Sequence, residues 1–424
     1  MCGIVGYLGN KQAKDVIIKG LKRLEYRGYD SAGISTLHSK KFKTTKTSGK
    51  VSELAASIPQ NGHKGGLGIG HTRWATHGIP NNENAHPHSD NSGKFTLVHN
   101  GIIENYSSLK LLLKDNGINC KTDTDTEVLV QFIGYLYKKE NLDFVETVRL
   151  ALTQVVGAYG IAVLCEDYPD MLISARLGSP LLLGIGEDEY FVASDSSPII
   201  EYTRNIVFLD EGEMAVLQSD SYHVRNINGN HIVSKDVKEI QYNLEEIEKG
   251  GYDHFMMKEI GEQAHTIREA IRGRVKIDDM QVTLGGIYDW VQQILDASHI
   301  IITACGTSWH ASLIGSYILE ELLNVPVKVE YASEFRYRKT AVNGNTVVIC
   351  VSQSGETADT LAAIKKAKEK GALTVGIVNV VGSSIARENH CGVYIHAGPE
   401  IGVASTKAFT AQVTIFNLIG ILLA

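Results

Sequence analysis

The sequence lacks the features that mark secreted, membrane-spanning and metal-binding proteins. Its 424 residues include only six cysteines, which are scattered without a Cys-x-x-Cys pair or a His-rich partner motif. This pattern argues against a disulfide framework or a zinc site and fits free thiols in a reducing cytoplasm. The first residues carry no basic segment and no long apolar run, so we expect no signal peptide. The most apolar stretch, residues 413–424, is too short to span a bilayer.

A strong charge of one sign is also absent. The formal net charge is -7 in a chain that is 21% charged, and basic residues occur only in short runs. This pattern predicts no surface for nucleic acid or for an anionic membrane. The second half contains neither a Walker A loop nor a G-x-G-x-x-G loop, so nucleotide binding has no support. We therefore expect no cofactor and no metal.

What the sequence does contain is two halves with different patterns. Residues 1–240 show clustered short strands, for example 3–8 and 95–99, together with amphipathic helices near 11–24 and 127–138. Strands that cluster in this way, without strict alternation with helices, predict an α+β domain built in layers.

The second half follows a charged segment with paired glycines, and we predict a linker at residues 241–253. In residues 254–424, five apolar runs alternate with segments of helix length. This alternation is typical of a parallel, doubly wound α/β sheet. The last helical segment stops within an apolar run, without a cap or a polar tail. We therefore expect the chain to be part of a longer protein.

The second residue, Cys2, offers a nucleophile and a base together. A small residue at this position permits removal of Met1, which leaves the thiol beside a free α-amine. Because the ordinary pKa of an α-amine is about 7.7–8.0, this group accepts a proton at neutral pH. A cysteine at position 2 carries no catalytic meaning by itself, so its significance depends on the rest of the sequence.

Six ordered motifs in the first half supply that context. They are MCGIVG (1–6), RGYDSAG (27–33), HTRWATHG (71–78), NAHP (84–87), HNGIIEN (99–105) and TDTE (124–127). In this order they resemble the class II, N-terminal-nucleophile glutamine amidotransferases across essentially the whole first 240 residues. The resemblance implies an αββα fold and a glutamine-hydrolysing activity in which Cys2 is the nucleophile.

The resemblance also assigns partners to Cys2. It gives the oxyanion hole to the Asn100 side-chain amide and the Gly101 backbone N–H, since such donors must lie where negative charge develops. Taken alone, this Asn-Gly pair is also typical of a tight hairpin turn after the strand 95–99. Arg73 offers a bidentate fork for the α-carboxylate of glutamine, and Asp125 offers a negative charge for its α-amine.

Four further residues belong to the same motifs. Thr76, His77 and His86 are expected to line the glutamine-binding loop, with His86 in a more structural role. Trp74 resembles the residue that closes over glutamine and gates the passage of ammonia. No Cys–His pair is required, because the α-amine already supplies the base.

Three polar loops follow strands of the second half. Their sequences are TACGTS (303–308), SQSGET (352–357) and EIGVASTK (400–407). Each is expected where the carboxyl end of a strand meets a helix, and free N–H groups with the helix dipole favour a phosphate there. Each cluster taken alone is equally typical of ordinary helix capping.

Together with ASEFRYR (332–338), these loops resemble a sugar isomerase (SIS) domain of the glutamine–fructose-6-phosphate aminotransferase family. The resemblance implies that six side chains hold the sugar phosphate: Thr307, Ser308, Ser352, Gln353, Ser354 and Thr357. Val403 and Ala404 would lie beside the sugar or the ammonia channel. The implied substrates are L-glutamine and fructose 6-phosphate. The complete enzyme is expected to be a cytoplasmic homodimer.

The resemblance extends over only part of the family's architecture, and we expect the second SIS domain to be missing from this chain. That domain carries a Glu, a Schiff-base Lys and a His from a neighbouring subunit, so we expect this chain alone to be competent only as a glutaminase. The absence of a long insertion in the first domain resembles the bacterial form.

Two alternatives remain at this point. The same glutaminase could serve another acceptor, but neither the paired-Asp loop of phosphoribosyl transfer nor the SGGxDS loop of asparagine synthesis occurs. The chain could also be a sugar-phosphate sensor with a vestigial glutaminase.

Overall fold

The structure is a computed structural model that describes residues 2–25, 28–59, 62–74, 79–240, 244–276 and 279–424. Its contacts divide the chain into two compact units, Met1–Gln241 and Tyr242–Ala424. Each unit has its own buried apolar core, so each is described by itself. Within the described ranges, no helix combines the length and the apolar character needed to cross a membrane.

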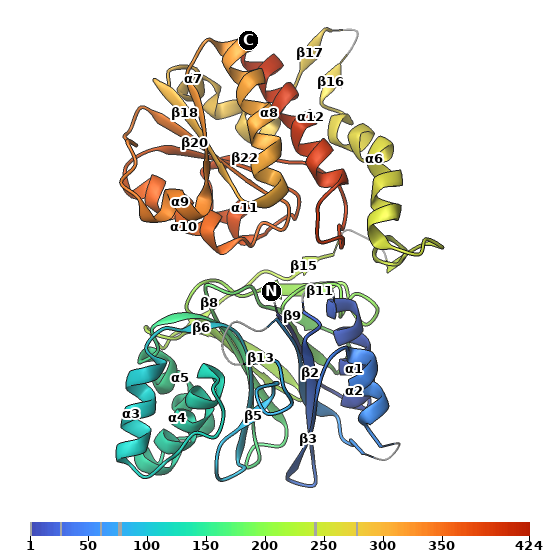
Figure 1. The fold of residues 1–424 in the computed structure, drawn as a ribbon, viewed down its shortest axis with the longest axis vertical. Coiled ribbons are helices and arrows are strands. Elements are labelled where there is room, and N and C mark those ends of the chain that lie inside the picture. Colours follow the sequence, from blue (N-terminus) through green and yellow to red (C-terminus); the bar gives the residue numbers. More distant parts are fainter. Residues whose placement is uncertain (1, 26–27, 60–61, 75–78, 241–243, 277–278) are drawn as a thin grey trace. The chain divides into compact units, whose positions relative to one another are not determined.

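Two antiparallel sheets form the centre of the first unit (Figure 1). One has the strand order β15-β11-β9-β10-β1-β4-β2-β3 and the other has the order β14-β13-β12-β8-β7-β6-β5. The strands of the first sheet are β1 (Gly3–Leu8), β2 (Ser31–His38), β3 (Lys41–Ser48), β4 (Leu67–Arg73), β9 (Leu182–Ile185), β10 (Tyr190–Ala193), β11 (Asn205–Phe208) and β15 (Lys238–Glu239). Those of the second are β5 (His88–Ser89), β6 (Phe95–Ile103), β7 (Gly157–Cys165), β8 (Met171–Leu177), β12 (Glu213–Gln218), β13 (Ser221–Asn226) and β14 (Ile232–Val233).

Helices cover the outer faces of these two sheets. The first sheet carries α1 (Ala13–Leu24) and α2 (Val51–Ser57), and the second carries α3 (Tyr106–Asp115), α4 (Asp125–Glu140) and α5 (Phe144–Thr153). Side chains of β7 alternate between the two cores, because successive residues of a strand point to opposite faces. Ile161 and Val163 pack with the helices, whereas Ala162 and Leu164 pack between the sheets. These layers confirm the predicted αββα fold.

The start of α4 is fixed by hydrogen bonds that its own sequence supplies. Thr124 Oγ1 accepts the backbone N–H of Glu127 at 3.2 Å. The Glu127 carboxylate in turn accepts the N–H groups of Lys121 at 2.9 Å and Thr122 at 2.6 Å. The first bond satisfies an N–H group that a helix start would leave without a partner, and the other two fix the segment that precedes the helix. Asp125 therefore stands in the first turn of α4, which begins two residues before the predicted helix.

The second unit is built around a parallel sheet with the order β19-β18-β20-β21-β22. These strands are β18 (His299–Ala304), β19 (Val327–Tyr331), β20 (Thr346–Ser352), β21 (Leu373–Val378) and β22 (Cys391–Tyr394). The helices are α6 (Phe255–Ile271), α7 (Val291–Leu295), α8 (Gly306–Leu323), α9 (Ala332–Tyr337), α10 (Ala358–Glu369), α11 (Ser384–Glu388) and α12 (Lys407–Leu423). Short elements η2 (Leu244–Ile247), η3 (Gly285–Trp290) and the pair β16 (Val275–Lys276) and β17 (Gln281–Val282) complete it.

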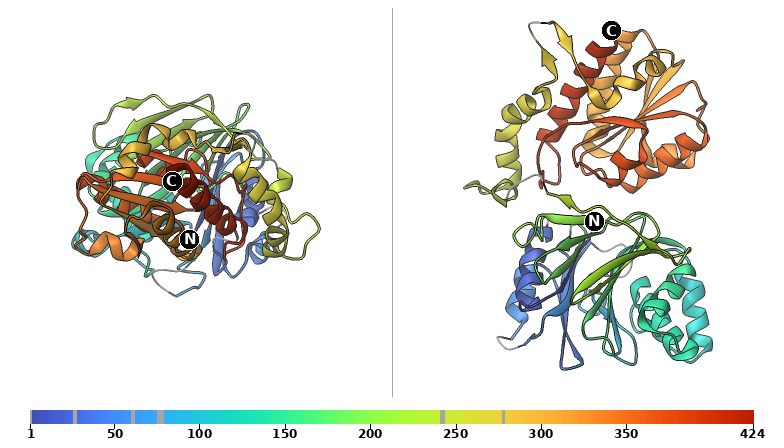
Figure 2. Two further views of the ribbon diagram at one scale, coloured as in Figure 1. Left: turned by 90° about the horizontal axis from the view of Figure 1, so that it is seen from above. Right: turned by 180° about the vertical axis from the view of Figure 1, so that it is seen from behind.

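Helices lie on both faces of this sheet, as Figures 1 and 2 show. Ile300 and Ile302 of β18 pack in the core that includes α8 and α12, whereas Ile301 packs in the core of α9, α10 and α11. α6 packs along α12. The arrangement confirms the predicted doubly wound parallel sheet, whose strands are apolar because both faces are covered.

One alternative from the sequence is wrong. Asn100 and Gly101 do not form a hairpin turn, since β6 continues through both residues to Ile103. Gly101 lies opposite Tyr159 of β7, and the pairing of these strands extends to Gly157. Cross-strand hydrogen bonding to β7 therefore overrides the local turn preference of the pair.

Candidate active site

Cys2 lies directly before the central strand of the first sheet. It precedes β1, which pairs with β10 on one side and with β4 on the other. Trp74, which directly follows β4, donates its backbone N–H to Cys2 Sγ at 3.2 Å, and its carbonyl oxygen lies 3.5 Å from the same sulfur. The pairing of β1 with β4 thus brings positions 2 and 74 into contact.

The surroundings of Cys2 favour the protonated thiol. Burial raises the pKa of this thiol above its ordinary value, and the hydrogen bond from Trp74 and the nearby Arg73 charge offset this only in part. Because the thiolate is the reactive form of cysteine, attack on an amide requires a base that removes the proton.

Asn100 reaches Cys2 from the second sheet. Its Nδ2 donates to the Cys2 backbone carbonyl oxygen at 3.2 Å, and its Oδ1 lies 2.9 Å from Nε2 of His71. The next residue, Gly101, has a φ of +126°, and a Cβ there would lie 2.0 Å from the carbonyl oxygen of Ala158. Only glycine tolerates this backbone without a shift of the strands. One predicted oxyanion donor therefore lies against the predicted nucleophile, and the other follows it on β6.

The two residues predicted to hold the ends of glutamine are both buried. Arg73 is the last residue of β4, and Asp125 opens α4. Asp125 Oδ2 accepts the backbone N–H of Ile103 at 2.8 Å. Ile103 ends the strand that carries Asn100, so β6 orients both the acidic residue and the amide. The N-terminus of α4 also favours the negative charge of this carboxylate.

The remaining residues of the predicted glutamine loop are only partly described. The Trp74 side chain is 46% exposed, and its ring packs edge-on against Tyr29 with centroids 5.4 Å apart. Thr76 and His77 lie outside the described residues.

His86 belongs to a cluster of four buried histidines, His71, His86, His88 and His99. The rings of His71 and His86 are 4.3 Å apart, those of His86 and His88 are 5.0 Å apart, and His86 Nδ1 accepts the His99 N–H at 3.4 Å. Burial lowers the pKa of all four imidazoles, to about 3 for His71. All four are therefore neutral at pH 7, and His86 packs among them beneath β6.

In the second unit, two predicted phosphate loops lie at the carboxyl ends of neighbouring strands. Thr307 and Ser308 stand in the first turn of α8 after β18, and residues 352–357 connect β20 to α10. Strands β18 and β20 pair in parallel, so the two loops are adjacent. Ser308 Oγ accepts from Gln412 Nε2 at 2.9 Å, and Ser352 Oγ accepts the Gly355 N–H at 3.0 Å. Both hydroxyls therefore also accept hydrogen bonds that hold neighbouring groups of the protein in place.

Other residues of the loop 352–357 also make hydrogen bonds within the loop. Ser354 Oγ accepts the Glu356 N–H at 3.2 Å, and Thr357 Oγ1 lies 3.2 Å from Ser352 Oγ. Gln353 stands half-buried between the two serines. The loop thus presents a series of hydroxyl and amide groups before the first turn of α10, which is the arrangement a phosphate prefers.

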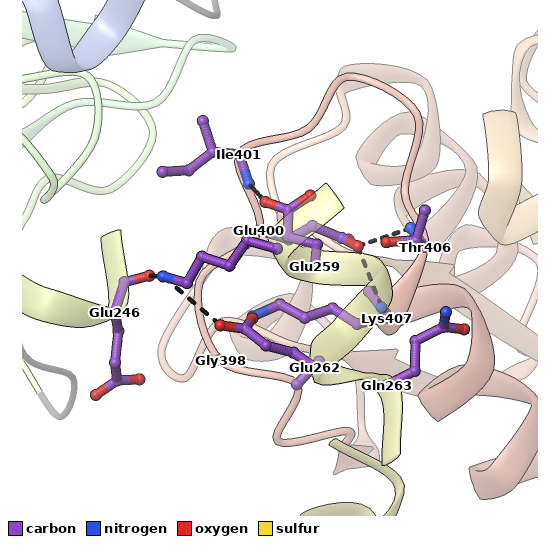
Figure 3. A network of polar contacts seen from close by, with 12 residues as sticks. Glu246, Glu259, Glu262, Gln263, Gly398, Glu400, Ile401, Thr406 and Lys407 are labelled. Carbon is purple, nitrogen blue, oxygen red and sulfur yellow. Dashed lines mark hydrogen bonds and ion pairs between the residues drawn. The ribbon is translucent and has the colours of Figure 1, made fainter. Parts of the chain in front are cut away.

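Two carboxylates hold the third loop, residues 400–407 (Figure 3). Glu259 of α6 accepts the N–H groups of Ile401 at 2.6 Å and Gly402 at 3.0 Å. Glu400 accepts the N–H of Thr406 at 2.7 Å at the start of α12. Between these points Val403 is 87% exposed. The conformation of the loop is therefore set by its backbone bonds to carboxylates.

Sequence reasoning missed two residues that shape these sites. It required no Cys–His pair and so gave no role to His71, and it did not single out Glu259, whose pKa is raised by burial. No local signal distinguishes either residue, because each acts on a segment far away in the sequence. Among the described residues, no group of side chains is arranged to bind a metal ion.

Comparison with known proteins first defines the class of each unit. Residues 60–253 match the model of a glutamine amidotransferase domain, and residues 293–422 match that of an SIS domain. The chain thus joins a class II glutamine amidotransferase to a sugar isomerase domain, which confirms both resemblances seen in the sequence.

Matches along the whole chain narrow this class to one family. The chain is 53% identical over 428 residues to the glutamine–fructose-6-phosphate aminotransferase (isomerizing) of Chlorobaculum tepidum. It is 51% identical over 426 residues to that of Bacteroides thetaiotaomicron and 48% identical over 424 residues to that of Pyrococcus horikoshii. These matches cover at least 99% of this chain and 69% of each relative. The chain belongs to the glutamine–fructose-6-phosphate aminotransferase family.

Proposed function

We propose that this chain hydrolyses glutamine at Cys2 and that, in the complete enzyme, the ammonia passes to fructose 6-phosphate. The products would be glutamate and glucosamine 6-phosphate. The observation that carries this proposal is the contact of the Asn100 amide with Cys2, at the strand ends where Arg73 and Trp74 also lie.

The reaction begins with the thiol, whose raised pKa makes a base necessary. After removal of Met1, the α-amine of Cys2 takes the proton from Sγ, and the sulfur attacks the side-chain amide carbon of glutamine. The carbonyl oxygen becomes an oxyanion, which Asn100 Nδ2 and the Gly101 N–H stabilise. The protonated amine then donates to the leaving nitrogen, the C–N bond breaks, and ammonia departs.

The second half of the reaction regenerates the thiol. Water loses a proton to the α-amine and attacks the γ-glutamyl thioester, which passes through a second oxyanion in the same place. The C–S bond breaks, sulfur recovers its proton, and glutamate is released. The same two donors therefore serve both steps.

Substrate selection comes from two buried charges of opposite sign. Arg73 would bind the α-carboxylate and Asp125 the α-ammonium, with Thr76, His77 and His86 completing the loop around the substrate. Trp74 would close over the bound glutamine. Burial strengthens such charge-assisted hydrogen bonds, because the local dielectric is low.

The second unit would hold the acceptor by its phosphate. The adjacent loops after β18 and β20 offer the N-termini of α8 and α10, with the hydroxyls of Thr307, Ser308, Ser352, Ser354 and Thr357 and the amide of Gln353. Val403 and Ala404 would lie beside the sugar or the channel. We also propose that the complete enzyme is a homodimer in the cytoplasm.

Glutamate release by the wild-type chain, Cys2→Ala and Cys120→Ala tests the first half of the proposal. Cys120 is a free, half-buried thiol of the same unit and provides the matched control. Loss of turnover in Cys2→Ala alone is expected. Equal turnover in all three chains would exclude Cys2 as the nucleophile.

Calorimetric titration with fructose 6-phosphate and with phosphoribosyl pyrophosphate tests the acceptor. Heat of binding from fructose 6-phosphate alone is expected. Preference for phosphoribosyl pyrophosphate would indicate another acceptor, and sugar binding without any glutamine turnover would favour the sensor.

A further inference from the structure

His71 is a fully buried residue of β4 whose ring reaches the neighbouring sheet. Its Nε2 lies 3.1 Å from the carbonyl oxygen of His99 and 2.9 Å from Asn100 Oδ1. Both contacts are to β6, whereas the backbone of His71 pairs with Ile4 of β1. His71 therefore links β1, the strand that follows Cys2, to β6, the strand that carries the proposed oxyanion donors.

These contacts determine which ring nitrogen carries the proton. A backbone carbonyl only accepts hydrogen bonds, so Nε2 of His71 must be the donor toward His99. The Asn100 atom that faces the same N–H must then be an acceptor, which is the amide oxygen. The NH2 group of Asn100 consequently points the other way, where it donates to the Cys2 carbonyl at 3.2 Å.

We propose that His71 is a positioning residue for glutamine hydrolysis, which holds the Asn100 amide with its N–H groups toward the reacting centre. The proposal rests on the function proposed above and extends it to a residue that does not touch glutamine. Without the donor at Nε2, the hydrogen bond from Asn100 Nδ2 to the Cys2 carbonyl would have to hold the amide orientation by itself. A flipped amide would present its oxygen to the oxyanion. The partial negative charge of the amide oxygen would then repel the oxyanion.

The neutral state of His71 is part of the same arrangement. Burial lowers its pKa to about 3, so the ring keeps one proton at working pH. The N–H of that single proton is fixed at Nε2 by the His99 carbonyl. His71 would act through geometry and not as a proton carrier.

A matched pair of variants tests whether the side chain at position 71 must place its donor at the position of Nε2 or need only be polar. His71→Gln places an amide NH2 near the position of Nε2, whereas His71→Asn carries the same amide on a shorter side chain. The expected result is a kcat close to wild type for His71→Gln. Since removal of one oxyanion donor costs about 10²–10³ in kcat, we expect a loss of about tenfold to a hundredfold for His71→Asn, with KM for glutamine little changed. Equal kcat for the two variants would refute the proposal.

A double-mutant comparison identifies the partner of His71. In an Asn100→Ala background the amide is already gone, so His71→Asn should cost less than about twofold. The same loss in both backgrounds would show that His71 acts elsewhere and would overturn the inference. His63→Asn is the control, because His63 is a buried histidine of the same unit whose ring contacts Thr36 and Thr45 within the described part of the chain.

Alkylation of Cys2 by iodoacetamide distinguishes positioning from structural damage. This displacement at a saturated carbon develops no oxyanion, so its rate should be the same in His71→Asn and wild type. A parallel fall of alkylation and glutaminase rates would indicate a disturbed nucleophile and refute the inference. Absence of Cys2-dependent turnover in the wild-type chain would instead overturn the proposed function, and with it this inference.

Discussion

The substitution Gly101→Ala tests the geometry of the proposed oxyanion hole most directly. Gly101 has a φ of +126°, and an added Cβ would lie 2.0 Å from the carbonyl oxygen and 2.7 Å from the carbonyl carbon of Ala158. Both atoms belong to the backbone of the paired strand β7, so no side chain can move aside. Since side-chain carbons essentially never approach another heavy atom within 3.0 Å, β6 and β7 must separate by about 1 Å at this point.

That shift moves the N–H predicted to meet the oxyanion. A misplacement of about 1 Å costs on the order of 10²-fold in rate, so kcat for glutamate release should fall by about that factor. The KM for glutamine should change less than kcat, because Arg73 lies on β4 and Asp125 is carried by α4, although its carboxylate also accepts the Ile103 N–H of β6. The assay is steady-state glutamate release at saturating and limiting glutamine.

A second glycine supplies the control. Gly93 also has a positive φ, +74°, but an added Cβ there meets no heavy atom within 4 Å. Gly93→Ala therefore carries the backbone strain of an alanine at positive φ, about 1–2 kcal/mol, without the clash. It should keep kcat within about twofold of wild type. If Gly101→Ala retained a third or more of the wild-type kcat, the assignment of this N–H to the oxyanion would be wrong.

Three further results are expected. Asp125→Asn removes the charge predicted to face the α-ammonium and should raise KM for glutamine by on the order of tenfold, with a smaller effect on kcat. Initial rates will show this, and an unchanged KM would remove Asp125 from the proposed binding site. Burial holds the pKa values of His71, His86 and His88 well below 6.5 in the folded chain, so below pH 6.5 the unfolded chain binds more protons and stability should fall by roughly 1.4 kcal/mol per pH unit for each of the three. Thermal unfolding at pH 7 and pH 5 checks this, and an equal midpoint at both values would contradict neutral burial. Ser352→Ala should weaken fructose 6-phosphate binding by on the order of tenfold in calorimetry, because it removes a hydroxyl and the acceptor of the Gly355 N–H. Ser316→Ala, whose hydroxyl bonds only within α8, should bind as wild type.

The fold was largely predictable, because the spacing of apolar residues and the order of strand-length and helix-length segments are clear in both units. The strands β18 and β21 coincide with the apolar runs 299–304 and 373–378. Such runs are typical of strands whose two faces are both buried in a parallel sheet. β19 also has the predicted bounds, 327–331, but it lies at the edge of the sheet and alternates apolar with charged residues. The hairpin alternative for the Asn-Gly pair failed, since local turn preference cannot foresee a partner strand 58 residues away, as Tyr159 is from Gly101.

The catalytic candidates were predictable from motifs, but their supports were not. His71 and Asn100 are 29 residues apart and lie on strands of different sheets, so their contact depends on how the two sheets stack. Glu259 and Ile401 are 142 residues apart. Patterns in a single sequence report the spacing of apolar residues along one helix or strand, whereas such pairs depend on the spatial arrangement of several elements.

In the loop at residues 400–407, the residues that fix the backbone are separate from the residue at the exposed tip, and this separation favours evolutionary change. Glu259 and Glu400 grip the two ends of the loop through main-chain N–H groups, which every residue type except proline provides. The exposed tip at Val403 contributes little packing to the fold. Replacements at the tip can therefore alter the shape and polarity of this surface while the ends remain in place. Single exchanges can accumulate there without first having to stabilise a new scaffold.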